Sequence, residues 1–170
     1  MEFTEVIKNR YSCKSYGEKQ VTKEQLEAIL EAGRTAPTAK NLQEQKIYVV
    51  QSEEGLKKID RATPCRYGAP TVLVVAFNTR EVFTYPGGSR DSGIEDAAIV
   101  ATHLMLGAYN ADVDSCWLNN FNPEELKKDL GLPEEEEILM LRDLGYASEN
   151  AKPLVNHFSR KELTETVQWR

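Results

Sequence analysis

Residues 70–78, PTVLVVAFN, form a nearly unbroken apolar run that limits the folds open to this chain. A half-exposed strand alternates polar and apolar residues, whereas a continuous apolar run needs cover on both of its faces. We therefore predict a central strand here, covered on both sides. The 170 residues suffice to bury such a core, and 41% hydrophobic with 28% charged residues is typical of a folded globular protein.

Helical and strand patterns alternate along the rest of the sequence. Apolar spacing and end signals predict helices at 1–9, 22–33, 53–60, 92–109 and 123–130. Short β-rich segments predict further strands at 46–51, 114–121 and 137–146. This order indicates a single domain over 1–170 in the α/β to α+β range, and the spacing leaves the strand order open.

Two segments look incompletely buried within one copy of the chain. The helix at 92–109 is apolar around nearly its whole circumference, which predicts either the domain centre or a dimer interface. The polar tail at 147–170 carries Val167 and Trp169, for which a compact monomer offers no evident partner. A C-terminal extension that wraps a second subunit would explain this tail.

Charge and composition argue against several classes of function. The net charge of −6 argues against broad binding to nucleic acid or to an anionic membrane. No apolar run approaches the roughly 20 residues of a membrane span, and MEFTEVIKNR lacks a signal-peptide core. Three scattered cysteines and two histidines favour reduced thiols and no metal site. We expect a cytoplasmic protein.

Arg10, Ser12 and Lys14 form the first candidate binding motif. Alternate residues of an extended segment point the same way, so these three side chains would project together. A guanidinium, a hydroxyl and an ammonium suit a phosphate monoester, although a solvated strand edge would also look like this. Arg160, in Ser159-Arg160-Lys161, reads by itself as a solvated basic patch.

Two polar segments form the remaining candidates. Asn41 and Gln43 follow Ala36 and Pro37 in a loop of small residues, and their amides suit the mixed edge of a pyrimidine-like ring. A helix end followed by a polar loop is the alternative. Asn119 and Asn120 lie at the end of the strand at 114–121. There they would either reach the rim of the sheet, where ligands collect, or form only a tight turn.

Taken together, these segments resemble the nitroreductase family of FMN-dependent flavoproteins. The resemblance rests on five matches in order, namely Arg10-x-Ser12-x-Lys14, the APTAKNLQ segment at 36–43, the CWLNNF segment at 116–121, Gly145-Tyr146 followed by Lys152-Pro153, and Arg160. It extends over essentially the whole chain. It implies an α+β three-layer sandwich, with a mixed but mainly antiparallel central sheet flanked by helices, in an intertwined homodimer with FMN at the interface.

The resemblance also assigns roles to the candidate residues. Arg10, Lys14 and Arg160 would hold the FMN phosphate, and Ser12 would meet ribityl or phosphate oxygens. Asn41 and Gln43, from the partner subunit, would approach the isoalloxazine ring, and the backbone at Asn119 and Asn120 would face its N5 edge. Hydride would pass from NADH or NADPH through the flavin to a small acceptor such as a nitroaromatic or a quinone, in a ping-pong cycle.

No side chain of the protein is expected to act as a catalytic acid or nucleophile, because the flavin carries the chemistry. Lys40 is a candidate for a cation that tunes the flavin, and the loop at 84–90 for a gate. Glu44 and Gln45 replace the family's proline and tryptophan, and Asn120 replaces a glycine. The alternatives are a flavin protein used for dehalogenation, storage or fragmentation, and a non-enzymatic dimer module.

Overall fold

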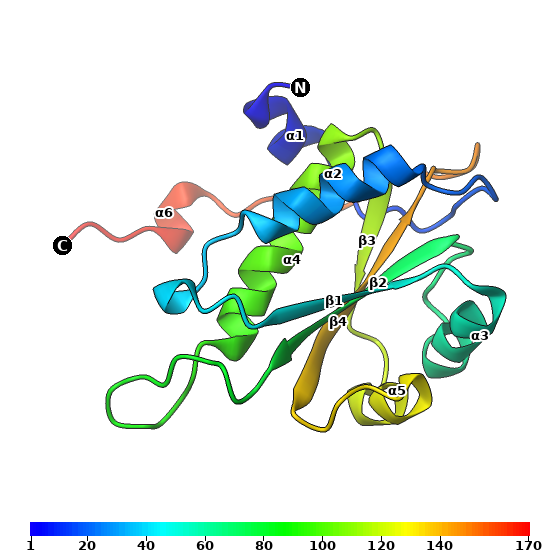
Figure 1. The fold of residues 1–170 in the computed structure, drawn as a ribbon. Coiled ribbons are helices and arrows are strands. Elements are labelled where there is room, and N and C mark those ends of the chain that lie inside the picture. Colours follow the sequence, from blue (N-terminus) through cyan, green and yellow to red (C-terminus); the bar gives the residue numbers. More distant parts are fainter.

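The sheet of the protein has four strands, and the computed structural model describes all residues from 1 to 170. The strand order is β1-β2-β4-β3, and each neighbouring pair is antiparallel (Figure 1). The strands are β1 (Gln45–Val50), β2 (Thr71–Asn78), β3 (Asp114–Leu118) and β4 (Glu136–Gly145). The predicted central strand is confirmed, since β2 lies between two neighbours and is buried along seven of its eight positions.

Helices cover both faces of this sheet and make a three-layer α+β sandwich, as expected. One face carries α2 (Lys23–Arg34) and α4 (Gly93–Asn110), and the other carries α3 (Glu53–Ala62) and α5 (Pro123–Leu130). Alternate residues of β2 point into two separate cores. Leu73 and Val75 pack with α2 and α4, whereas Val72 and Val74 pack with α3 and α5.

Local signals in the sequence account for several helix ends. Thr22 and Gln25 form a capping box at the start of α2, where the sequence predicts the helix to begin. The Asn122 side chain accepts hydrogen bonds at the start of α5, and Gly131, at φ 67°, ends that helix in the left-handed region. The prediction that Gly33 ends α2 was wrong, because the helix continues to Arg34.

Gly33 instead allows α2 and α4 to approach each other closely. A Cβ at this position would lie 2.6 Å from Cδ2 of Leu104 on α4, too close for a normal contact. The predicted strand at 114–121 is also shorter than expected, since β3 ends at Leu118 and leaves Asn119 and Asn120 outside the sheet.

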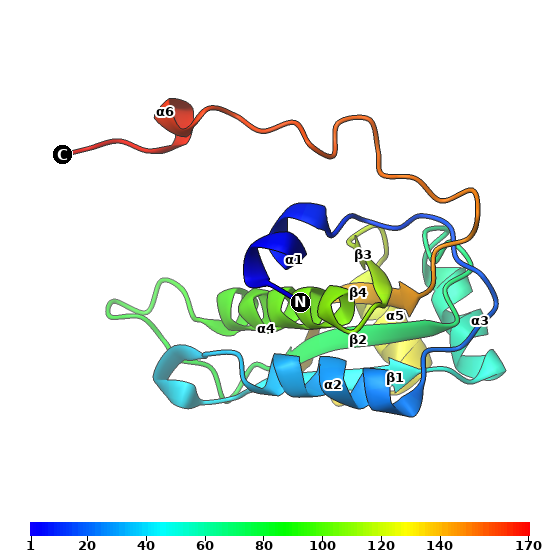
Figure 2. The same cartoon turned by 90° about the horizontal axis from the view of Figure 1, so that it is seen from above.

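Two surfaces remain uncovered within one chain. The outer side of α4 exposes Ile94 and Ile99, the latter by 38%, so this helix is not buried on every side. Beyond the bridge between Tyr16 and Ala147, the C-terminal tail leaves the body of the molecule (Figure 2). It contains a short helix that the sequence did not predict, α6 (Leu163–Thr166), and it leaves Trp169 94% exposed.

The loop between α2 and β1 adopts a strained backbone. It contains a single 3-10 turn, η1 (Ala39–Asn41). Lys40, Asn41 and Gln43 have φ of 52°, 57° and 56°, a region that costs non-glycine residues about 1 kcal/mol each. Two hydrogen bonds hold this conformation, from the Gln43 amide to Oγ1 of Thr38 at 3.1 Å and from the Ala39 amide to Oδ1 of Asp96 at 2.9 Å.

A buried pair of carboxyl groups lies beneath this loop. Glu44 is 1% exposed and Asp96, in the first turn of α4, is 3% exposed. Both oxygens of Glu44 and Oδ2 of Asp96 lack a hydrogen-bond partner. Burial and the adjacent Asp96 carboxyl raise the pKa of Glu44 to about 7. A proton on Glu44 therefore allows the two groups to lie side by side.

The variant Glu44→Gln, which replaces the titrating carboxyl by an amide, tests whether the proton on Glu44 stabilises the fold. Because the pKa of Glu44 rises on folding, from 4.5 to about 7, its stabilising effect is complete below 4.5 and is lost as the pH rises through 7. We expect the free energy of unfolding of the wild type, relative to Glu44→Gln, to fall by on the order of 2 kcal/mol between pH 5 and pH 8. Urea denaturation across this range measures the difference.

The control for this experiment is Glu18→Gln, at an exposed carboxyl with no ion pair in the structure. This variant should keep the pH dependence of the wild type. An equal pH dependence in the wild type and in Glu44→Gln would show that the Glu44 proton does not stabilise the fold.

Candidate functional site

The segment after α1 (Phe3–Asn9) runs beside the sheet. Ser12 forms a parallel bridge with Ser115 of β3, through a hydrogen bond of 3.0 Å from the Cys13 amide to the Ser115 carbonyl. Half-buried Arg10 directs Nη1 toward Sδ of Met105 on α4, at 3.9 Å. The first candidate motif therefore lies between β3 and the C-terminal half of α4.

The C-terminal tail brings a second arginine to Arg10. Burial and the neighbouring Arg160 lower the pKa of Arg10, and burial with both arginines lowers the pKa of His157. The His157 ring also lies 6.3 Å from the ring of Tyr11. Arg160 is oriented by hydrogen bonds to the carbonyls of His157 and Ser159, at 2.6 and 2.7 Å. Arg10 and Arg160, 150 positions apart in the sequence, are thus near each other in the fold.

These cations have no acidic partner within the chain. None of the seven salt bridges involves Arg10, Lys14 or Arg160. In a protein with a net charge of −6, two arginines without an acidic partner, near enough for one to lower the pKa of the other, fit an anionic ligand such as a phosphate. Lys14 has a different environment, because its ammonium lies 5.8 Å from the centre of the Tyr67 ring.

The end of β3 carries the predicted asparagine pair. Trp117 donates from Nε1 to Oδ1 of Asn119 at 2.7 Å, which fixes the Asn119 side chain at the rim of the sheet. Asn120 donates to Sγ of Cys65 at 3.5 Å, and this bond, with one from Tyr67, lowers the pKa of the Cys65 thiol. Both asparagines are exposed, so they are open to a ligand.

Sequence reasoning missed two residues of this region. Cys65 lies in the connection between α3 and β2, where no motif marks it. Arg142 lies in β4 and is 1% exposed, with its guanidinium 5.2 Å from the Trp117 ring. The only sequence signal for Arg142 is a charged pair, Arg142-Asp143, inside an otherwise apolar strand.

Asn41 and Gln43 lie apart from the arginines in a single chain. Their loop is attached to Asp96 near the start of α4, whereas Arg10 contacts Met105 further along the same helix. With a rise of 1.5 Å per residue, these two contact points are on the order of 13 Å apart. One chain therefore gathers Arg10, Ser12 and Arg160 around α1, but it does not bring Asn41 and Gln43 to them.

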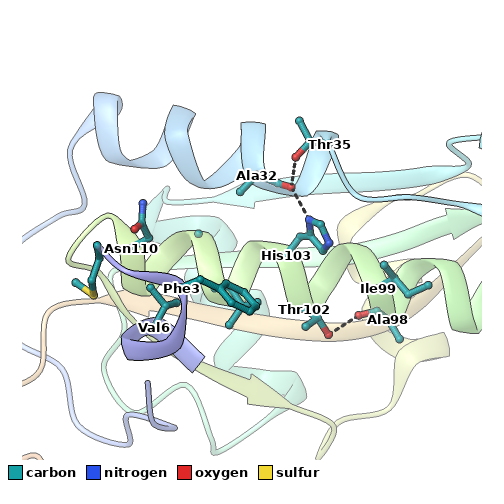
Figure 3. Close-up of a pocket in the computed structure, with 12 residues that line it drawn as sticks. Phe3, Val6, Ala32, Thr35, Ala98, Ile99, Thr102, His103 and Asn110 are labelled. Atoms are coloured by element: carbon teal, nitrogen blue, oxygen red, sulfur yellow. Dashed lines mark hydrogen bonds between the residues drawn. The ribbon is translucent and has the colours of Figure 1, made fainter. Parts of the chain in front are cut away.

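An apolar groove of about 640 Å³ opens on the outer side of α4 (Figure 3). Phe3 and Val6 of α1 form one wall, and Ile99 and Thr102 of α4 form another. None of the eight predicted cofactor residues lines it. The groove offers apolar surface and no cluster of reactive groups.

Neither metal chemistry nor a membrane span finds support among the side chains. No group of three or more His, Cys, Asp and Glu residues is placed to hold a metal ion. No helix combines the length and the apolar character that crossing a membrane requires.

Comparison with known proteins places the chain in a family. The sequence model described as "Nitroreductase family" matches residues 7–67 and 64–146. A nitroreductase family protein from Clostridium difficile 630 has 34% identity and a TM-score of 0.92, with 99% of this chain and 98% of that chain covered. A relative from Archaeoglobus fulgidus, provisionally named NADH dehydrogenase/NAD(P)H nitroreductase, is 29% identical over 85% of each chain.

A structure from Exiguobacterium sibiricum, described as a nitroreductase in complex with FMN, shares the fold. Its TM-score is 0.87 at 19% identity, with 100% of this chain and 98% of that chain covered. The family model thus matches most of the chain, and the Clostridium difficile structure covers nearly all of it. The chain belongs to the nitroreductase family.

Proposed function

We propose that the protein is an FMN-dependent oxidoreductase that uses NADH or NADPH to reduce a small acceptor such as a nitroaromatic or a quinone. The observation that carries this proposal is the meeting of Arg10 and Arg160 without an acidic partner, at the position where family membership leads us to expect a phosphate. The names of the Archaeoglobus relative and of the FMN complex support the electron donor and the cofactor.

In this proposal each candidate residue binds or orients the cofactor. Three cations would hold the phosphate, namely Arg10, Lys14 and Arg160. Ser12 would contact ribityl or phosphate oxygens, and Asn119 and Asn120 would border the flavin edge. FMN, when bound, would accept hydride from the nicotinamide and pass it to the acceptor. Two substrates that use one open face in turn would give ping-pong kinetics. Three free cysteines are consistent with a reducing, cytoplasmic compartment.

We further propose that two copies complete each site. The groove beside α4 and the exposed Ile94 and Ile99 provide an apolar surface of the kind that a partner covers. A second copy could bring Asn41 and Gln43 to the arginines of the first, which would resolve their separation within one chain. The projecting tail with Trp169 would then pack on the partner.

The activity is tested with purified protein supplied with FMN. We expect a yellow protein that oxidises NADH or NADPH when a quinone or a nitroaromatic is present, measured by absorbance at the flavin and nicotinamide bands. A protein that stays colourless after reconstitution would contradict the proposal.

Arg10→Ala tests the phosphate site. Loss of a charge-assisted hydrogen bond should weaken FMN binding by about 1.5–3 kcal/mol, as measured by quenching of flavin fluorescence on titration. The matched control is Arg61→Ala, at an exposed arginine that pairs with Asp129 on the surface. Unchanged FMN affinity in Arg10→Ala would remove Arg10 from the site.

Ile99→Asp tests the second subunit. A carboxylate in the apolar surface of α4 should shift the protein from dimer to monomer in sedimentation velocity and should reduce FMN retention in parallel. Val49→Asp, at an exposed position of edge strand β1, is the control and should change neither property. A monomeric wild type that binds FMN fully would contradict the shared site.

A further inference from the structure

We propose that Arg142 is a third arginine of the cofactor site, and that the phosphate of bound FMN compensates its buried charge together with the charges of Arg10 and Arg160. This inference rests on the proposed function, because it assumes that FMN is the anion. It adds a residue of β4, which no motif marked, to the residues that would recognise the phosphate.

The environment of Arg142 provides no counterion. Nη2 donates to the Ala101 carbonyl of α4 at 3.1 Å, the guanidinium lies against the Trp117 ring, and Nε has no partner. Burial lowers the pKa of Arg142 to about 10, so the side chain remains a cation at neutral pH. Burying a cation is unfavourable unless an opposite charge meets it.

Asp143, the next residue, does not serve as that counterion. Successive residues of a strand point to opposite faces, and Asp143 pairs in register with Cys116, whose side chain belongs to the core on the α3 and α5 side. Burial raises the pKa of Asp143 to about 9, so its carboxyl is protonated at neutral pH. Both oxygens also lack hydrogen-bond partners.

The geometry of α4 places Arg142 beside Arg10. Arg142 bonds to Ala101 and Arg10 contacts Met105, and these two helix residues are one turn apart on the same side of α4. Besides burial, the positive charge of Arg10 contributes to the lowered pKa of Arg142, and Arg160 acts on Arg10 in the same sense. Arg10 thus interacts unfavourably with each of the other two guanidiniums, an effect that a bound anion would relieve.

Trp117 connects this group to the end of β3. The guanidinium of Arg142 packs over the Trp117 ring. The Nε1 group of Trp117 donates a hydrogen bond to Asn119, which would border the flavin. Arg142 is therefore a buried residue beneath the proposed cofactor site, between the helix that contacts Arg10 and the ring of Trp117.

Two roles are possible for Arg142, a charge that meets the ligand or a bond that joins β4 to α4. The two roles predict opposite effects of Arg142→Met on stability. If the positive charge of Arg142 is compensated only by the bound ligand, Arg142→Met should stabilise the protein without FMN, because it removes an unpaired buried cation. If Arg142 only joins β4 to α4, the same substitution should destabilise the protein, because the bond to Ala101 is lost.

The test compares wild type and Arg142→Met for thermal stability without FMN and for binding of FMN and riboflavin. We expect the apoprotein Tm to rise by about 2 °C or more. The Kd for FMN should rise about tenfold, the equivalent of one charge-assisted contact, while the Kd for riboflavin, which lacks the phosphate, changes less than about twofold.

Two further variants make the comparison specific. Arg142→Lys keeps the charge and should keep the preference for FMN over riboflavin within about threefold of the wild type. Arg66→Met removes an arginine of the opposite face that pairs with Asp60, at 2.5 Å, and should lower the apoprotein Tm without changing that preference.

Several results would overturn the role of Arg142. These are a lower apoprotein Tm or a failure to fold in Arg142→Met, an equal loss of FMN and riboflavin binding, or a lost preference for FMN in Arg142→Lys. Failure of the proposed function is distinct, since the wild type would then bind neither flavin.

Discussion

The rest of the structure depends on the packing of α4 against α2 and the sheet. Small residues along this helix allow close contact, and a Cβ on Gly107 would lie 2.6 Å from Cβ of Ala32 on α2. The same helix then positions the site. Asp96 holds the loop of Asn41 near its start, the Ala101 carbonyl holds Arg142, and Met105 contacts Arg10. A shift of α4 would displace all three at once.

Much of this fold could be predicted from the sequence because its signals are local. The apolar run of β2 requires cover on both faces, and Thr22 and Asn122 begin their helices with their own side chains. The shared location of Arg10 and Arg160 could be expected only from the order of motifs along the chain. Strand order and the closeness of Gly33 to Leu104 arise from tertiary contacts, which spacing does not encode.

The site itself was less predictable, for physical reasons that differ between residues. Arg142 lies within an apolar strand, and only the fold shows that its side chain reaches α4 and Trp117. Glu44 looks like a polar loop residue until Asp96, from a distant helix, is placed beneath it. Cys65 gains its lowered pKa mainly from Asn120, a neighbour that the sequence does not indicate. The contacts of Arg142, the environment of Glu44 and the pKa of Cys65 each depend on a second residue that is distant in the sequence.

The two tryptophans of the chain occupy opposite environments, which makes the protein its own optical reporter. Trp117 lies half-buried between Arg142 and Asn119, whereas Trp169 stands almost free in the tail. Indole emission is blue in an apolar setting and red in water, so the two signals separate without any added label. Changes near the sheet rim alter the Trp117 component, and docking of the tail alters the Trp169 component. Ligand entry and subunit contact can therefore be followed separately in one cuvette.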